Sequence, residues 1–408
     1  MKILIVNKFL YPRGGAESYM LGIGKKLSES GHEIQYFGMM DPKNTVGNKL
    51  GKYTGNMDFH TGSLRKLAYP FKIIYSVEAK RKIGAVLDDM KPDVVFLNNI
   101  NFQLTPSIID AAYKRHIPTV WTLHDCQLVC PDHLMYNADR KCVCEKCVGG
   151  SKWNCVKDKC IHSSRIKSII GTAEAYFYRH RSTYKKVGAF ISPSAFLYSK
   201  LLKDNSDLFS GRTYVLHNFL SKRSLPKDAK SSFDFPYIAF AGRLSTEKGV
   251  AVLAETAKLL PYVKFVVMGD GPEKHLLENI PNVILTGFLS GEELDNKLAF
   301  AEAVAVPSVC YENCPLSILE ARMFSVPAVT MNMGGMAELV EDGVTGILSQ
   351  STEPKDFAAA IRKILDDKER LAVMKQNCKS ASKNDADIDM YCDELLKIFD
   401  SVSEGKNA

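Results

Sequence analysis

Residues 306–329 read VPSVCYENCPLSILEARMFSVPAV, and this stretch decides how the second half of the chain folds. The apolar run from Ala303 to Val306 before it predicts a buried strand that ends at Pro307. Pro315 suits the first turn of a helix, so a helix is predicted over Leu316 to Met323. The polar residues between these two elements therefore collect at the carboxyl end of a strand.

Two carboxylates bracket this turn, Glu312 in the loop and Glu320 in the helix, eight positions apart. Backbone N–H groups at a helix start suit phosphate oxygens, and carboxylates suit sugar hydroxyls. The groups available between the glutamates belong to Cys314, Leu316 and Ser317. This pattern predicts a nucleotide-sugar site. The alternative is that Glu312 is a surface acid and Glu320 a helix acid paired with Arg322 or another neighbour.

The two glutamates, with Pro315 and Leu316 between them, resemble the paired-glutamate signature of the family 4 retaining glycosyltransferases. In that family the earlier glutamate contacts hydroxyls of the donor sugar and the later one the ribose, and the resemblance implies these roles here. The usual Gly-Phe-Gly after the first glutamate is replaced by Asn313-Cys314-Pro315, which leaves the choice of sugar open.

The length of 408 residues suits two domains. Strands and helices alternate in both halves, which predicts an α/β fold of two Rossmann-like domains facing each other across a cleft, the GT-B arrangement. We expect a first domain at 1–220, a linker at 221–235, a nucleotide-sugar-binding domain at 236–385 and a C-terminal segment at 386–408. The resemblance implies that this last helix returns to the first domain.

No apolar run approaches the ~20 residues that a membrane helix needs, and Met1 to Val6 is expected to be a short strand, so we expect a cytoplasmic protein. The net charge is +7, but residues 1–235 hold 36 Lys/Arg against 20 Asp/Glu, and residues 236–408 hold 17 against 26. The first half is therefore expected to face something acidic.

Basic residues mix with apolar and aromatic ones in 64–87 and in 141–186. This texture suits the anionic inner face of the plasma membrane, where a lipid-linked glycan would serve as acceptor. An ordinary solvated helix face explains the first stretch equally well, and nucleic acid would suit the second.

The first strand runs into a glycine loop, Gly14-Gly15, before a helix over Ser18 to Ser28. This order is the start of a Rossmann-like half, but it lacks the dinucleotide Gly-x-Gly-x-x-Gly pattern, which argues against an NAD enzyme. Family 4 enzymes carry a similar loop, so the resemblance implies that Gly14 and Gly15 lie at the donor. Asn218, at the end of a short strand from Tyr214, is expected there as well.

The strand from Pro118 to Leu123 ends in His124-Asp125. We expect His124 to contact the transferred sugar, and Asp125 to orient the acceptor or act as its base. A structural hydrogen-bonded pair is the alternative. The family carries a histidine at a matching strand end, which favours the catalytic interpretation.

The second half opens with a strand over Tyr237 to Ala241 and the loop Gly242 to Gly249, in which Arg243 and Lys248 are placed to hold a diphosphate. A salt-bridged loop is the alternative. Gly-Arg-Leu followed by Lys-Gly is a family 4 signature, and these two cations bind the donor diphosphate there. Further donor contacts are expected from residues at strand ends, namely Gly242, Gly269, Gly271, Gly287 and Phe288.

Seven of the eleven cysteines fall between Cys126 and Cys160, which in a cytosolic chain indicates metal ligands rather than disulfides. Cys144-x-x-Cys147 has zinc-knuckle spacing. Some family 4 polysaccharide enzymes carry a similar insert, and this resemblance suggests the ligands Cys130, Cys144, Cys147 and Cys160. A structural zinc is expected, with an iron–sulfur cluster as the alternative. The Asp385-Ala386-Asp387 motif precedes the last helix, and no catalytic divalent metal is expected.

These patterns predict a transferase that moves a hexose or N-acetylhexosamine from a UDP- or GDP-sugar to a lipid-linked glycan, as in the assembly of O-antigen or capsule. Retention of the anomeric configuration is implied by the family resemblance. Two alternatives stay open: a sugar-nucleotide epimerase or phosphorylase of the same fold, and a basic metal-knuckle protein that binds nucleic acid.

Overall fold

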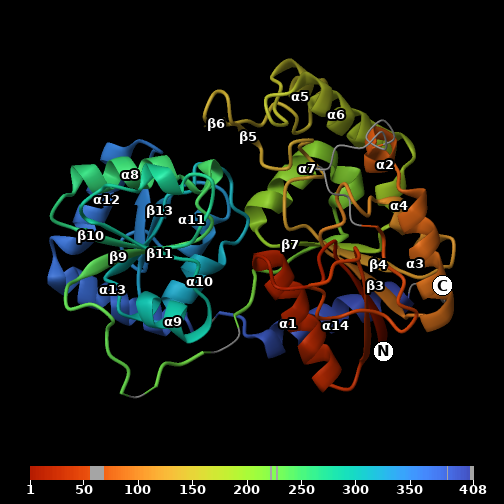
Figure 1. Cartoon of the computed structure of the whole chain (residues 1–408). Coiled ribbons are helices and arrows are strands. Elements are labelled where there is room, and N and C mark those ends of the chain that lie inside the picture. Colours follow the sequence, from red (N-terminus) through yellow and green to blue (C-terminus); the bar gives the residue numbers. More distant parts are fainter. Residues whose placement is uncertain (56–68, 221–222, 227, 384, 405–408) are drawn as a thin grey trace. The chain divides into compact units, whose positions relative to one another are not determined.

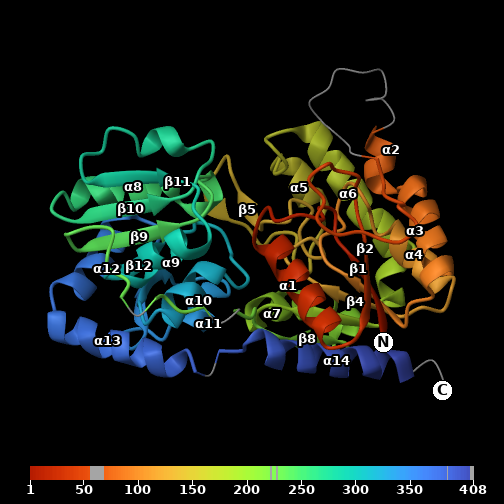
Figure 2. The same ribbon diagram turned by 60° about the horizontal axis from the view of Figure 1, so that its bottom comes forward.

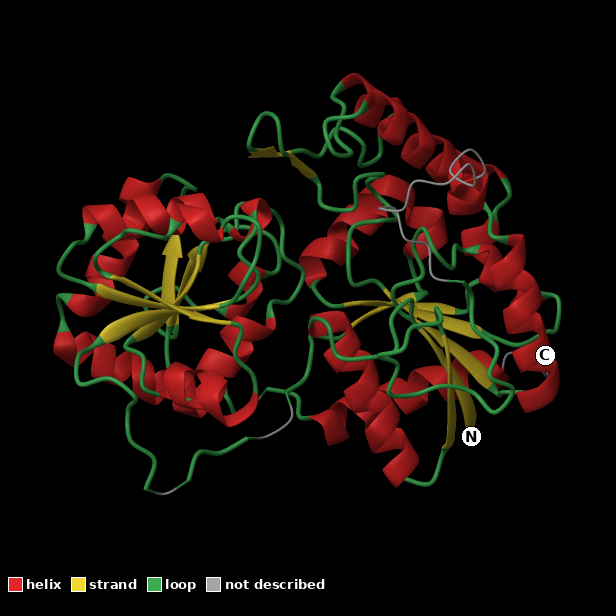
Figure 3. Ribbon diagram, viewed as in Figure 1, coloured by secondary structure: helices red, strands yellow, loops and turns green. Residues whose placement is uncertain are grey.

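The computed structural model describes residues 1–55, 69–220, 223–226, 228–383 and 385–404. It divides the chain into two compact units. Unit 1 holds Met1–Leu134, Cys144–Phe219 and Ile388–Ala408, and unit 2 holds Met135–Val143 and Leu220–Asp387. Each unit is built on a six-stranded parallel sheet with helices on both faces (Figures 1 and 3).

The sheet of unit 1 has the strand order β2-β1-β3-β4-β7-β8. Its four central strands are apolar runs that are buried almost throughout, as expected for strands covered on both faces. The strands are β1 (Lys2–Val6), β2 (Glu33–Phe37), β3 (Val94–Leu97), β4 (Thr119–Thr122), β7 (Ala189–Ser192) and β8 (Thr213–Val215). Because all of them are parallel, the residues that follow β1, β3 and β4 meet at one edge of the sheet.

The helices of unit 1 are α1 (Gly15–Glu29), α2 (Tyr69–Ile74), α3 (Val77–Met90), α4 (Ser107–Tyr113), α5 (Trp153–Lys157), α6 (Arg165–His180), α7 (Ala195–Phe209) and α14 (Ile388–Glu404). A 3₁₀ turn, η2, covers Thr183–Lys186. The last helix, α14, packs on α1 and β4 (Figure 2). The hydroxyls of Tyr19 on α1 and Tyr391 on α14 are 2.6 Å apart within this buried contact.

The sheet of unit 2 has the strand order β11-β10-β9-β12-β13-β14, in which the first three strands are arranged differently from those of unit 1. Its strands are β9 (Tyr237–Ala241), β10 (Lys264–Met268), β11 (Val283–Gly287), β12 (Ala303–Val306), β13 (Ala328–Met331) and β14 (Gly346–Ser349). Its helices are α8 (Val250–Leu259), α9 (Gly291–Ala299), α10 (Leu316–Met323), α11 (Met336–Leu339), α12 (Pro354–Leu365) and α13 (Lys368–Ala381). Two 3₁₀ turns cover Thr246–Lys248 and Lys274–Leu276, and a small hairpin pairs β5 (Tyr136–Asn137) with β6 (Cys142–Val143).

The predicted fold class, two Rossmann-like α/β domains with the last helix on the first of them, is confirmed. Local differences remain. The helix predicted over Ser18 to Ser28 begins earlier, at Gly15, and ends at Glu29. Residues 56–68, which include the start of the basic stretch at 64–87, lie outside the described residues. No helix in the described part of the chain is long and apolar enough to cross a membrane.

Candidate functional site

In unit 2, the loops that follow β9, β10 and β12 are joined by backbone hydrogen bonds. The N–H of Gly242 donates to Met268 O at 3.0 Å, and the N–H of Val309 donates to Glu247 O at 3.0 Å. A Cβ on Gly269 would lie 1.9 Å from the carbonyl oxygen of Gly242, so only glycine allows this approach. The three loops therefore form one framework at the carboxyl edge of the sheet.

This framework brings Lys248 against Glu312. Lys248 Nζ lies 2.6 Å from Glu312 Oε1, and Ser308 Oγ donates to the same oxygen at 2.9 Å. Burial lowers the pKa of Lys248, but the Glu312 carboxylate outweighs it, so the net shift is upward. The ammonium group is therefore charged at any physiological pH. It lies beside the Glu312 carboxylate, in the loop that precedes the helix α10.

The start of α10 lies directly after this pair. Pro315 precedes the helix in an extended conformation, and no side chain caps the first turn, so the N–H groups of Leu316 and Ser317 have no partner inside the helix. The N–H of Gly335 donates to Glu312 O at 2.7 Å, which fixes the loop against the residues after β13. Cys314 is buried and anchors the loop in the core. Positive charge and helix N–H groups thus lie close together, as an anionic ligand requires.

The second glutamate, Glu320, binds a cation from the chain that enters unit 2. Arg223 Nη2 donates to Glu320 Oε1 at 2.7 Å, and Arg223 Nη1 lies 3.0 Å from Asp295 Oδ1 on α9. Burial raises the pKa of Glu320, and Arg223 partly opposes that rise. Arg322 does not pair with Glu320: it binds Asp385 and the carbonyl oxygen of Leu339. The alternative that Arg322 neutralises Glu320 is therefore wrong.

Other predicted donor residues lie at the same edge of unit 2. Arg243 is exposed, and Gly271 packs against the backbone of Leu244. Gly287 has a φ of +77°, which favours glycine, and Phe288 after it is 77% exposed. An exposed aromatic ring of this size at a strand end is available to stack on a planar ligand.

Unit 1 contributes a second polar cluster. His124 follows β4, and its Nε2 lies 2.9 Å from Asn98 Oδ1 after β3. The ring of Tyr19 contacts the His124 ring edge-on, with centroids 4.9 Å apart. Burial lowers the pKa of His124 to about 4, with the nearby Asp125 opposing the shift. The imidazole is therefore neutral at physiological pH and can donate or accept one hydrogen bond without carrying charge.

Asp125, the next residue, is held by three groups. Asn101 Nδ2 donates to Asp125 Oδ2 at 2.9 Å, the N–H of Gln127 donates to Oδ1 at 2.9 Å, and His133 Nδ1 lies 3.5 Å from Oδ2. Burial raises the pKa of Asp125, but the charge and hydrogen bond of His133 dominate and bring it to about 2. So acidic a carboxyl is a weak base at neutral pH, which favours the orienting role over proton abstraction.

The sequence interpretation missed several residues of this cluster. His133 stacks on the Phe102 ring with centroids 5.0 Å apart, and its pKa is raised because the attraction of Asp125 outweighs burial. Asn7 Nδ2 lies 3.3 Å from the buried Glu17 Oε1, and burial lowers the pKa of Lys8. Asn7, Lys8, Asn98 and Asn101 all lie within four residues of a strand's carboxyl end, a signal that could have found them. His133 offered no such signal.

The predicted residues Gly14, Gly15 and Asn218 also belong to unit 1. Gly14 precedes α1 in an extended conformation, Gly15 opens the helix, and Asn218 is half-buried. The predicted residues therefore belong to both units. His124, Asp125 and these three residues lie in unit 1, and the remaining donor residues lie in unit 2.

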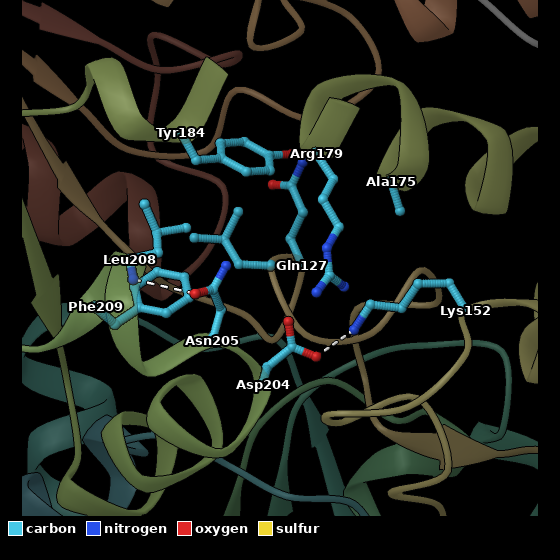
Figure 4. A pocket seen from close by; sticks show the side chains of 10 residues that line it. Gln127, Lys152, Ala175, Arg179, Tyr184, Asp204, Asn205, Leu208 and Phe209 are labelled. Atoms are coloured by element: carbon cyan, nitrogen blue, oxygen red, sulfur yellow. Dashed lines mark hydrogen bonds and ion pairs between the residues drawn. The ribbon is translucent and has the colours of Figure 1, made fainter. Parts of the chain in front are cut away.

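A cavity of about 40 Å³ in unit 1 is lined by residues that include Gln127, Lys152 and Arg179 (Figure 4). It could hold a few water molecules, since each needs roughly 10–15 Å³, and it is too small for a sugar. Lys152 lines it and is only 4% exposed, with its Nζ bonded to Val129 O, Cys147 O and Asp204 Oδ1 at 2.8, 2.7 and 2.5 Å. The inclusion of Lys152 in a basic surface is therefore wrong: it fastens the cysteine-rich segment to α7.

Four of the seven clustered cysteines, namely Cys130, Cys147, Cys155 and Cys160, lie close enough to interact. The thiols of Cys155 and Cys160 are hydrogen-bonded, which raises the pKa of Cys155, and Cys130 and Cys147 act on the same group electrostatically. Burial raises the pKa of Cys147 to about 11, with nearby Lys152 opposing the rise. Within the described ranges, no three His, Cys, Asp or Glu side chains are placed to hold a metal ion as they stand. Zinc therefore stays a prediction from the spacing.

Comparisons with known proteins agree with this geometry. Residues 13–221 match the Glycosyltransferase Family 4 model, and residues 221–381 match the model described as Glycosyl transferases group 1. The alpha-D-kanosaminyltransferase of Streptomyces kanamyceticus is 31% identical over 180 residues, which cover 41% of this chain and 46% of that protein. The UDP-Gal:alpha-D-GlcNAc-diphosphoundecaprenol alpha-1,3-galactosyltransferase of Escherichia coli is 28% identical over 184 residues, covering 42% and 46%.

The matched segments thus span about half the length of these two relatives. Among solved structures, Anabaena Alr3699/HepE in complex with UDP and glucose is similar over 98% of this chain and 100% of that chain, with a TM-score of 0.69 and 20% identity. The two family matches lead to one conclusion: the chain belongs to Glycosyltransferase Family 4.

Proposed function

We propose that this protein transfers a hexose or an N-acetylhexosamine from a UDP- or GDP-sugar to a hydroxyl of a lipid-linked glycan, with retention of the anomeric configuration. The observation that carries this proposal is the Lys248–Glu312 pair at 2.6 Å beside the start of α10, with Glu320 about one turn further along that same helix. A cation, helix N–H groups and two carboxylates are the groups that a sugar diphosphate needs.

In the transfer, the bond between the sugar C1 and the diphosphate oxygen breaks, and a bond forms between C1 and the acceptor oxygen. Negative charge grows on the departing diphosphate, where Lys248, Arg243 and the N–H groups of α10 stabilise it. The acceptor proton passes to a departing phosphate oxygen. Glu312 binds hydroxyls of the donor sugar, and Glu320 binds the ribose.

The polar cluster of unit 1 serves the sugar and the acceptor. His124 is neutral, so it binds a sugar hydroxyl without opposing the positive charge that develops at C1. Asp125 stays ionised, and its negative charge orients an acceptor hydroxyl rather than removing its proton. Because cationic side chains supply the charge on the diphosphate, no catalytic divalent metal is expected.

The donor and acceptor classes are supported by the comparisons. The name of the Escherichia coli relative gives UDP-Gal as donor and an undecaprenol-linked diphosphate glycan as acceptor, and the Anabaena protein was solved with UDP and glucose. A lipid-linked acceptor of this kind would place the present protein at the anionic inner face of the plasma membrane, as a peripheral cytoplasmic enzyme of polysaccharide biosynthesis.

The test is nucleotide release from a panel of UDP-, GDP- and ADP-sugars, followed with and without an undecaprenyl-linked acceptor. One donor should turn over, and both Lys248→Ala and Glu312→Ala should lower its release by about a hundredfold or more. Lys258→Ala is the matched control, because Lys258 pairs with Glu255 in an exposed bridge on α8 of the same unit. Turnover of a donor without consumption of any acceptor would point to an epimerase or phosphorylase instead.

A further inference from the structure

The first half of helix α6 (Arg165–His180) exposes several apolar residues. Ile166 is 71% exposed and Ile169 is 44% exposed, and Ala173, one turn further, is exposed as well. Residues three and four apart share one helix face, so these side chains form an apolar stripe. A surface helix normally directs such a stripe toward the core. On α6 the stripe formed by Ile166, Ile169 and Ala173 instead points away from the core.

The opposite face of α6 is small and polar because it packs closely on backbone. Ser168 Oγ accepts the N–H of Ile161 at 3.1 Å, and Thr172 Oγ1 donates to Lys152 O at 3.2 Å. A Cβ on Gly171 would lie 2.5 Å from Ile161 Cδ1, so this face has no room for a larger side chain at Gly171, and Tyr178 is fully buried near the end of the helix. The orientation of α6 is therefore fixed by these contacts, and the apolar stripe cannot turn inward.

The neighbouring helix α5 adds an aromatic residue to this region. Trp153 is 52% exposed, and α5 packs against α6 at the margin of unit 1 (Figure 1). Tyr176 OH of α6 accepts the N–H of Lys152 at 3.0 Å, which holds the start of α5 in place. Tryptophan favours the boundary between water and lipid, where its ring is apolar and its N–H is hydrated.

The exposed charged residues of the segment that holds α5 and α6 are all of one sign. Between residues 144 and 186, every one of which is described, the three carboxylates Glu145, Asp158 and Glu174 are half-buried or buried. The exposed charged residues are Lys146, Lys157, Lys159, Arg165, Lys167, Arg179, Arg181 and Lys185. A surface of exposed isoleucine, tryptophan and cations complements an anionic lipid bilayer.

We propose that α5 and the exposed face of α6 form the surface by which this protein docks on anionic membranes, inserting Trp153, Ile166 and Ile169 at the level of the lipid headgroups. The identity of the occupant rests on the proposed lipid-linked acceptor, which resides in such a bilayer, and on the charge of the surface. The cations bring the protein to the bilayer, and the apolar stripe retains it there.

The test is co-sedimentation with vesicles of phosphatidylcholine alone or with phosphatidylglycerol added. The protein should bind the anionic vesicles, with an affinity that falls as salt rises. Ile166→Asp combined with Ile169→Asp should weaken binding at least about tenfold. Val373→Asp is the matched control, since Val373 is 59% exposed on α13 and outside this surface, and it should bind as the unchanged protein does.

Tryptophan fluorescence gives a second measurement. The chain has two tryptophans, and Trp121 is 2% exposed while Trp153 is 52% exposed. Anionic vesicles should therefore shift the emission of Trp153 to shorter wavelength, and Trp153→Phe should abolish the shift. The proposal would be overturned if the Ile166→Asp, Ile169→Asp variant bound vesicles as the unchanged protein does, or if the protein bound uncharged vesicles equally well. It would also be overturned if the unchanged protein formed a dimer in solution and this variant did not, because the exposed face of α6 would then be a contact between two copies of the chain.

Donor turnover separates this inference from the proposed function. Nucleotide release in the absence of acceptor should be the same in the doubly substituted variant, because neither isoleucine lies in the predicted site. Vesicle binding without any donor turnover would sink the transferase proposal and leave the docking surface standing. Normal donor turnover without vesicle binding would refute the docking surface and leave the transferase proposal standing.

Discussion

Lys248 Nζ and Glu312 Oε1 lie 2.6 Å apart although the two residues are 64 positions apart in the chain. Lys248 ends a 3₁₀ turn after β9, and Glu312 lies in the loop after β12, so adjacent strands of one sheet bring them together. The pair places a cation for phosphate and a carboxylate for hydroxyls side by side. It also means that each group holds the other in position before a donor arrives.

Replacing Lys248 with Ala should lower kcat/KM for donor turnover by about 10²–10³-fold, because the leaving diphosphate loses its stabilising charge. Ser308→Ala should cost about tenfold or less, since Ser308 Oγ gives Glu312 one hydrogen bond and Lys248 remains. Steady-state nucleotide release measures both, and thermal unfolding checks the fold. Equal rates for Lys248→Ala and the control Lys258→Ala would refute the assignment.

Arg223 controls the ionisation of the second glutamate. The guanidinium lies between Glu320 and Asp295, and burial already raises the pKa of both carboxyls. Arg223→Ala should raise the pKa of both carboxyls further, so a larger fraction of Glu320 is protonated and accepts a ribose hydroxyl only through a weaker, uncharged hydrogen bond. We expect KM for the donor to rise about tenfold near neutral pH and to recover as the pH is raised.

The measurement is KM for the donor across pH 5.5–8.5 in the unchanged protein, Arg223→Ala and Arg223→Lys. The acidic limb of 1/KM should move to higher pH in the alanine variant and less in the lysine variant. Arg362→Ala, an exposed arginine on α12, is the control and should leave the profile in place. A tighter donor in Arg223→Ala would instead mean that Arg223 competes with the ribose.

The strands and loops of the candidate site could be predicted from the sequence, but the side chains that pair with its charged residues could not. Strands buried on both faces are continuous apolar runs, so β1, β9 and β12 and the loops that follow them were recognisable, and with them Glu312, Glu320 and Lys248. The partner of Glu320 was not, because Arg223 is 97 positions away and reaches it only through the tertiary fold. A neighbour on the same helix, Arg322, was the natural local choice and is engaged by Asp385 instead.

Exposure was also hard to predict from local pattern. Lys152 stands in a basic stretch, yet it is 4% exposed because Asp204 and two backbone carbonyls surround its ammonium group. Ile166 and Ile169 of α6 are exposed although an apolar stripe ordinarily faces the core. In both cases the deciding contacts come from segments distant in sequence or from backbone, which a residue pattern does not report.

The spacing of the cysteines between Cys126 and Cys160 predicts a bound zinc ion. Purified protein should contain about one zinc ion per chain, and Cys147→Ser should lose it and lower Tm, because a thiolate ligand is removed. Metal content by mass spectrometry of the folded protein measures this. Cys142→Ser is the matched control, since Cys142 is exposed on the small hairpin and outside the predicted ligand set. Iron with acid-labile sulfide would identify a cluster, and a metal-free stable protein would end the prediction.

The depressed pKa of His124 sets the sign of an acid effect on stability. The folded pKa is about 4 against an ordinary value of 6.5, so as pH falls below 6.5 the unfolded chain takes up a proton that the folded protein excludes. The free energy of unfolding should therefore fall between pH 6.5 and pH 4, by about 1–3 kcal/mol for this group, and this contribution should level off below pH 4. Urea unfolding of the unchanged protein and of His124→Asn across this range gives the difference, and the variant should lose less stability on acidification.

The control is His116→Asn, at an exposed left-handed position that asparagine tolerates, and its stability should follow that of the unchanged protein. Parallel curves for the unchanged protein and His124→Asn would show that His124 takes up its proton as readily in the folded protein as in the unfolded chain, and the neutral role proposed for it in sugar binding would fall.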